Sequence, residues 1–131
     1  MHVSTPITAM YAGALGILLL VLAYRVVSVR RTSDIGLGDG ANETLLRAIR
    51  VHGNAVEYVP IALILMLILE LNGASGVLLH GLGVTLLVAR IAHAQGLTSS
   101  RGASPGRLGG VVLTWSVIGV AAISVLLLGL D

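Results

Sequence analysis

The sequence holds its clearest chemistry in four polar residues at helical spacing: Arg47, Arg50, Asn54 and Glu57. At about 100° per residue they fall within an arc of about 80° on one face of a helix. Arginine pairs bidentately with carboxylates, and a carboxylate such as Glu57 receives an ammonium group. This face therefore suits a small ligand that carries carboxylates and an ammonium group and is anionic overall.

The composition excludes several classes of protein. Of the 131 residues 56% are hydrophobic, above the roughly 45–50% of soluble domains, so this is not an ordinary water-soluble domain. The 8 arginines come with no lysine, no phenylalanine and 1 tryptophan, which argues against nucleic-acid binding through a basic patch with stacking aromatic residues. Without cysteine there is no disulfide, thiolate metal site or cysteine nucleophile. No carboxylate lies at metal-ligand spacing from the histidines, so the sequence does not predict a metal site.

Four apolar stretches account for nearly all of this hydrophobic content, and each is about as long as the roughly 20 residues that a helix needs to cross a bilayer. Asn42 is a good N-cap, with Glu43 at the positive end of the helix dipole. The Gly- and Ser-rich segment Gly96–Arg107 is predicted to be a flexible loop. The fold class is therefore an all-α integral membrane four-helix bundle, a single domain over residues 1–131. The predicted helices are Ile7–Val29, Asn42–Leu71, Gly76–Gln95 and Leu108–Leu130.

The first apolar stretch could instead be a signal peptide, which needs a positive segment before it and a small-residue cleavage site after it. Neither is present, so we expect a retained span. The arginines flank the first and third loops, and the opposite side has none. Because basic residues concentrate in cytoplasmic loops, both termini are expected to face away from the cytoplasm.

Helix length indicates how deep the polar residues lie. Counting back from Asn72 at the outer surface, roughly 30 Å of hydrocarbon is crossed near His52, so Glu57 lies at hydrocarbon depth and requires a partner. Arg90 lies about 20 Å from the outer end of its helix, a matching depth. We therefore predict a Glu57–Arg90 ion pair. His93 follows Arg90 by one turn.

These features also have simpler explanations. The Glu57–Arg90 pair could serve structure alone. Glu70 lies next to the outer surface, where we expect it to be solvated, and His52 and His80 are expected to be packing or interface residues. Five arginines, taken singly, suit anchoring in lipid headgroups, since long cationic side chains reach the interface: Arg25, Arg30, Arg31, Arg101 and Arg107.

The segment from Arg47 to Pro60, RAIRVHGNAVEYVP, resembles the signature of the MAPEG family, the membrane-associated proteins of eicosanoid and glutathione metabolism. The end of the first helix, VVSVRR, is similar to leukotriene C synthases, and the segment from Ala89 to His93, ARIAH, is similar to microsomal prostaglandin E synthases. The stretch from Arg50 to Tyr58, RVHGNAVEY, looks most like the small bacterial branch of the family. Together with the four helices, the resemblance covers essentially the whole chain.

The resemblance implies a homotrimer of four-helix subunits in a bacterial inner membrane, with glutathione at the subunit interfaces near the cytoplasmic side. Arg47 would be a neighbouring contact, His93 a neighbour of the site, and Arg90 a support for Glu57. A family arginine at the start of the last helix activates the glutathione thiol, and Arg107 is its first candidate here, Arg101 its second. By position, the residues that would hold glutathione are Arg30, Arg50, Asn54, Glu57 and Tyr58.

The expected function is that of a glutathione-dependent transferase or peroxidase acting on lipophilic electrophiles that enter from the bilayer. A thiol with a pKa of about 8.5 is mostly protonated at neutral pH, and a close guanidinium favours the thiolate. Several catalytic members have a tyrosine where Leu97 stands here, so the alternative is a non-catalytic membrane protein that binds glutathione or an anionic lipid headgroup at the same site. A small multidrug transporter is a third class, but such proteins rely on a carboxylate deep in the first helix, which has none between Ile7 and Ala23.

Overall fold

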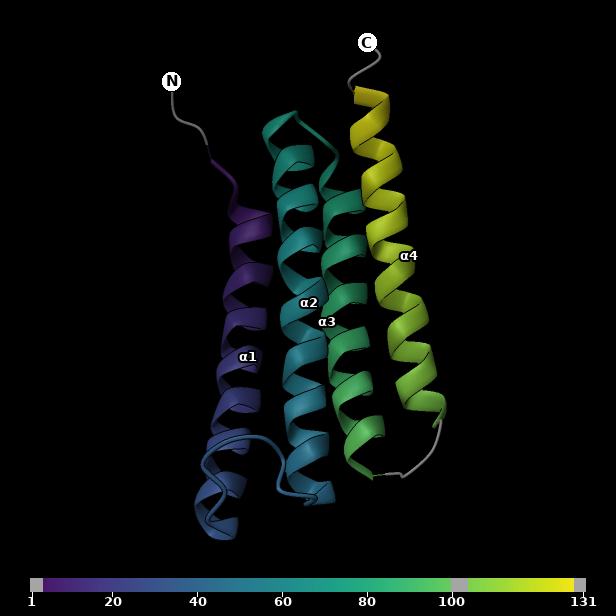
Figure 1. The fold of residues 1–131 in the computed structure, drawn as a ribbon. Coiled ribbons are helices and arrows are strands. Elements are labelled where there is room, and N and C mark those ends of the chain that lie inside the picture. Colours follow the sequence, from purple (N-terminus) through teal and green to yellow (C-terminus); the bar gives the residue numbers. More distant parts are fainter. Residues whose placement is uncertain (1–3, 100–103, 129–131) are drawn as a thin grey trace.

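The computed structural model describes residues 4–99 and 104–128, which form four long helices arranged up and down (Figure 1). Within these two ranges there is no strand. Each helix is long and apolar enough to cross a membrane. The predicted four-helix membrane bundle is therefore confirmed. The helices are α1 (Pro6–Ser33), α2 (Glu43–Leu71), α3 (Gly76–Ser99) and α4 (Pro105–Leu128).

The loop between α1 and α2 is framed by two clear helix caps. Asn42 caps α2 as predicted, because its Oδ1 accepts a hydrogen bond from the backbone N–H of Leu45 at 3.0 Å. Helix α1 is followed by Asp34, which has left-handed backbone angles and donates its N–H to the carbonyl of Arg30. Helix α1 therefore runs to Ser33, one turn longer than predicted.

The connection between α3 and α4 is shorter than predicted, because the expected loop Gly96–Arg107 is helical at both ends. Helix α3 continues to Ser99 and α4 begins at Pro105. Helix α4 approaches α3 closely at Gly96, where a Cβ atom would collide with the backbone nitrogen of Arg107. Ser104 also donates its hydroxyl to the Gly96 carbonyl at 3.1 Å. Gly96 thus permits close contact between helices rather than a turn.

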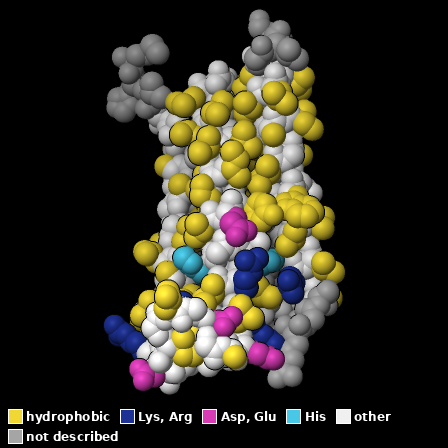
Figure 2. All heavy atoms as spheres, viewed as in Figure 1, with side chains coloured by type: hydrophobic (Ala, Val, Ile, Leu, Met, Phe, Trp, Pro, Cys, Tyr) yellow, Lys and Arg dark blue, Asp and Glu magenta, His cyan; other side chains and the backbone are white. Residues whose placement is uncertain are grey.

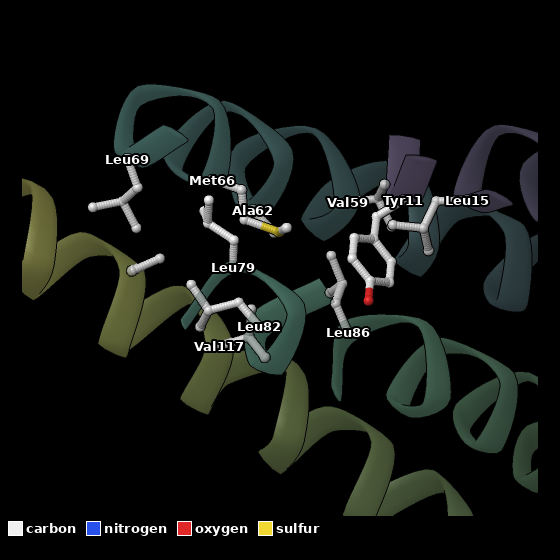
Figure 3. Packing of buried hydrophobic residues seen from close by; sticks show 11 residues of the cluster. Tyr11, Leu15, Val59, Ala62, Met66, Leu69, Leu79, Leu82, Leu86 and Val117 are labelled. Atoms are coloured by element: carbon white, nitrogen blue, oxygen red, sulfur yellow. The ribbon is translucent and has the colours of Figure 1, made fainter. Parts of the chain in front are cut away.

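Two apolar clusters make up the core. The larger one draws side chains from all four helices (Figure 3), including Tyr11, Met66, Leu86 and Val117. The smaller one joins α1, α2 and α3 through Leu22, Val51, Ala55 and Leu97. Large apolar side chains also cover the outside, with Leu20 71% and Leu126 69% exposed. So much exposed apolar surface suits a lipid environment rather than water.

Glu70, near the end of α2, caps the start of α1, so the expectation that it is merely solvated is wrong. Its two carboxylate oxygens accept the backbone N–H groups of Ile7 at 2.9 Å and Thr8 at 2.7 Å. These are N–H groups of the first turn, which have no partner within their own helix. Close by, the Tyr11 hydroxyl lies 3.0 Å from Nδ1 of His80 and links α1 to α3.

Charged side chains gather toward one end of the bundle. Figure 2 shows arginine and acidic side chains over one half of the visible face and hydrophobic side chains over the other half. The charged end is the end of the α1–α2 and α3–α4 connections, while the α2–α3 turn lies at the opposite end (Figure 1). This polarity is the one expected from the arginines. Which end faces the cytoplasm stays a prediction.

Candidate functional site

A cavity of about 300 Å³ opens at the charged end, between the start of α2, the end of α3 and the start of α4. We call it the arginine pocket. It brings together five of the residues predicted for the site, and Leu97 also lines it. Its lining residues are Glu43, Leu46, Arg47, Arg50, Asn54, His93, Leu97 and Arg107.

The arginines of the pocket come from two helices. Arg47, Arg50 and Asn54 share one face of α2, as their spacing predicts, and Arg107 lies in the first turn of α4. Arg47 is 3.6 Å from the carboxylate of Glu43, a partly exposed ion pair of small energetic value. Within residues 4–99 and 104–128, no carboxylate lies within ion-pair distance of Arg50 or Arg107. The pocket is therefore strongly cationic and suits an anionic ligand.

Arg90 lies behind the pocket and holds two of its walls in place. It is 1% exposed, and its guanidinium donates to Oδ1 of Asn54 at 2.7 Å and to Oγ1 of Thr114 at 3.4 Å. It also lies 3.0 Å from Nδ1 of His93. Because a guanidinium only donates, Nδ1 must accept here and Nε2 must carry the proton of the neutral ring. This network joins α2, α3 and α4 and fixes how Asn54 and His93 are presented.

The predicted Glu57–Arg90 ion pair does not form. Glu57 is exposed on α2, and within the described ranges it makes no hydrogen bond or ion pair. The amide of Asn54, one turn earlier, takes the place beside Arg90. Counting residues along the two helices placed Glu57 and Arg90 at the same depth in the membrane. It did not tell which side of α2 faces α3. The pairing depends on which side of α2 faces α3, and Glu57 lies on the exposed side, away from Arg90.

Three further candidates lie outside the lining of the pocket. Arg30 donates to the carbonyls of Gly38 at 2.8 Å and Ile35 at 3.4 Å, so it holds the α1–α2 loop. Tyr58 is half-buried and does not line the cavity. Arg101, the second candidate for the thiol, lies outside the described residues. Of the two candidates, Arg107 therefore has an observed place in the pocket.

Sequence reasoning missed the role of Thr114. Its side chain is fully buried, accepts from Arg90 and donates to the Gly110 carbonyl at 2.7 Å. A threonine in the middle of the apolar α4 is the signal that could have found it. Gly110, one turn earlier, lets α4 approach α3, since a Cβ atom there would lie 2.6 Å from the Ala89 carbonyl oxygen. The close α3–α4 contact brings Thr114 within reach of Arg90.

Comparison with known proteins agrees with this architecture. The sequence model of the MAPEG family matches residues 8–127, which include all four helices almost completely. The chain is also 43% identical over 90 residues to the inner membrane protein YecN of Escherichia coli strain K12, which covers 69% of each chain. The YecN protein of E. coli O6:H1 strain CFT073 matches with the same identity and coverage. The bundle of four apolar helices is thus an integral membrane protein, and this chain belongs to the MAPEG family.

Proposed function

We propose that the arginine pocket binds glutathione and that the chain is a glutathione-dependent membrane transferase or peroxidase for lipophilic electrophiles. The observation that carries the proposal is the convergence of three guanidiniums, from Arg47, Arg50 and Arg107, on one cavity of about 300 Å³. That volume lies at the lower end of the range of roughly 300–1,000 Å³ typical of small-molecule sites. Membership of the MAPEG family supports the choice of glutathione among small anionic ligands.

The chemistry of the lining residues fits the groups of the tripeptide. Arg47 and Arg50 are suited to its two carboxylates, because a guanidinium forms bidentate bonds with a carboxylate. Asn54 and the protonated Nε2 of His93 offer further hydrogen bonds to the peptide groups. Arg107 is then left for the thiol, where its positive charge favours the thiolate over the thiol.

The ammonium group of glutathione needs an acidic partner, and we propose that a second copy of the chain helps to supply it. Glu57 is exposed at a depth where a membrane-embedded carboxylate requires a partner. A homotrimer that buries this face of α2 would bring Glu57, and with it Tyr58 and Arg30, to a site shared between subunits. Glu43, paired with Arg47 at the pocket, is the acid that the chain itself offers.

In the transferase reaction, the thiol first loses its proton to solvent, and the thiolate sulfur then forms a bond to the electrophilic carbon. The leaving group departs with the electron pair of its broken bond. In the peroxidase reaction, the thiolate attacks the terminal oxygen of a hydroperoxide, and a second glutathione completes a disulfide while an alcohol and water are formed. In both reactions Arg107 acts by stabilising negative charge on sulfur.

Leu97 favours a second candidate function, binding of glutathione without turnover. Its side chain lines the pocket where a tyrosine hydroxyl stands in several catalytic members, and leucine cannot donate a hydrogen bond to sulfur. An anionic lipid headgroup would satisfy the same three arginines. These alternatives share the site with the leading proposal and differ from it in ligand or in turnover, so one set of measurements separates them.

The test measures thermal stability of the purified chain in detergent and conjugation of a chloronitrobenzene electrophile. Glutathione at about 100 times its Kd should raise the free energy of unfolding by about 2.7 kcal/mol. Arg50→Ala and Glu57→Ala should lose this stabilisation, whereas Arg31→Ala, an exposed arginine outside the pocket, should keep it. Turnover that Arg107→Ala lowers supports the enzyme. Binding without turnover favours the second candidate, and no stabilisation of the wild type contradicts both glutathione proposals.

A further inference from the structure

A second cavity, of about 340 Å³, lies between α1 and α3 at the charged end and contains the side chain of Arg25. We call it the Arg25 notch. It is lined by Arg25, Ala94, Gln95 and Thr98, none of which lines the arginine pocket. The two cavities share only α3, because the arginine pocket is built by α2, α3 and α4 and the notch by α1 and α3. The notch is therefore a feature that the proposed glutathione site does not use.

Arg25 is held across the notch by a short chain of hydrogen bonds. Its guanidinium donates to Oγ1 of Thr98 at 2.8 Å, and the Thr98 hydroxyl donates to the Ala94 carbonyl at 2.6 Å. The contact with Thr98 uses one of the five N–H donors of the guanidinium. In the part of the chain that the structure describes, no carboxylate lies within ion-pair distance of Arg25. The cation is thus positioned, with donors to spare and without a counter-ion.

Helix length places the notch at the depth of the bilayer phosphate groups. About 20 residues of helix cross roughly 30 Å of hydrocarbon, which takes α1 from Ile7 to near Arg25 and α3 from Gly76 to near Gln95. One turn deeper on the same two helices, Val21 is 58% and Ile91 40% exposed. A cavity that contains a cation thus borders directly on apolar surface at the level of the hydrocarbon.

From these observations we infer that the Arg25 notch binds the phosphate of an anionic phospholipid. The fork of a guanidinium matches phosphate oxygens, and Thr98 fixes the orientation of that fork. The acyl chains would lie against Val21 and Ile91, which a free phosphate ion would leave uncovered. Because exposed apolar side chains lie directly below the notch, its occupant is a lipid rather than a soluble phosphate. Binding at the notch is independent of glutathione in the arginine pocket.

The test counts bound lipids by native mass spectrometry of the full chain in detergent, with phosphatidylglycerol or phosphatidylcholine of the same acyl chains. Wild type should retain phosphatidylglycerol preferentially. Arg25→Gln should reduce its retention by about tenfold or more, because it removes the charge-assisted hydrogen bonds of the positioned guanidinium to the phosphate as well as the charge. Thr98→Val, which keeps the charge but removes the tether, should also reduce it. Arg31→Gln is the matched control, because it removes an exposed arginine from the same helix end.

Equal retention of both lipids by the wild type would overturn the inference, and so would an equal loss in Arg25→Gln and Arg31→Gln, which would mean a diffuse charge effect. A third measurement adds inorganic phosphate to the lipid-bound wild type. If millimolar phosphate displaces the lipid from wild type, the site is one for free phosphate and the lipid assignment is wrong. Glutathione stabilisation should be the same in Arg25→Gln and wild type, so failure of the glutathione proposal leaves this test intact.

Discussion

Within residues 4–99 and 104–128, Arg90 is the one arginine whose side chain is buried, and the walls of the arginine pocket depend on it. Arg90→Met keeps a long side chain but leaves Asn54 and His93 without their shared partner. Hydrogen bonds to charged groups contribute about 1.5–3 kcal/mol each. We therefore expect glutathione affinity, measured by titration calorimetry in detergent, to fall by about tenfold or more, since about 1.4 kcal/mol corresponds to a factor of ten.

A double-mutant cycle distinguishes positioning from a direct charge effect of Arg90. If Arg90 acts through Asn54, the combined Arg90→Met and Asn54→Ala variant should lose little more affinity than either single variant, because contacting residues couple. Additive losses would mean that Arg90 attracts the ligand by its charge alone. Arg90→Lys is a further check, since lysine keeps the charge but cannot reach Asn54, His93 and Thr114 with one planar group.

Much of the candidate site could be predicted at the level of single residues. Arg47, Arg50 and Asn54 lie on one helix, and helical periodicity fixes their relative direction without further information. The partner of Arg90 depends on how two helices are rotated toward each other, which neither depth nor spacing determines. Three residues of the predicted face of α2, Arg47, Arg50 and Asn54, therefore do line one cavity, while the fourth, Glu57, lies outside it. The predicted pairing of Arg90 with Glu57 was wrong, because Asn54, one turn away, takes that place.

At the scale of helices, Gly96 is one of the positions where α3 and α4 approach each other closely. Gly96→Ala should destabilise the chain by about 1–3 kcal/mol, because its Cβ would collide with the backbone of α4. Gly81→Ala, on the same helix with open space around it, should be neutral or stabilise by about 0.5–1 kcal/mol. Thermal unfolding in detergent measures both. Equal effects of the two substitutions would contradict the close α3–α4 contact.

Helix ends show which element-level features sequence alone can predict. Asn42 caps its own helix, so the cap is visible as a local pattern, and it was predicted. Glu70 caps a different helix, 62 and 63 residues away along the chain, and no local pattern indicates it. The same distinction applies to Gly96, whose effect on structure comes from α4 rather than from its own helix. Local rules predict local contacts, and the errors concern contacts between helices.

At the scale of the whole molecule, the number of helices follows from composition because the thickness of a bilayer sets the length of each apolar stretch. The bundle buries few side chains and exposes many large apolar ones, which agrees with lipid as its solvent. The charged residues are also distributed unevenly, with the arginines toward one end of the bundle (Figure 2). Hydropathy and charge therefore determine the spans and their polarity, while the association of helices depends on small residues and polar contacts.

The distribution of arginines also predicts the orientation of the chain in the membrane. The sequence contains no cysteine, so a single introduced cysteine can be labelled without background. Ser75→Cys in the α2–α3 turn and Leu37→Cys in the α1–α2 loop place exposed thiols at opposite ends. Because arginines concentrate on the cytoplasmic side, a membrane-impermeant maleimide should label Ser75→Cys in intact spheroplasts and Leu37→Cys only after permeabilisation. The reverse pattern would place the arginine pocket outside the cytoplasm, away from the cytosolic glutathione pool that the proposed function requires.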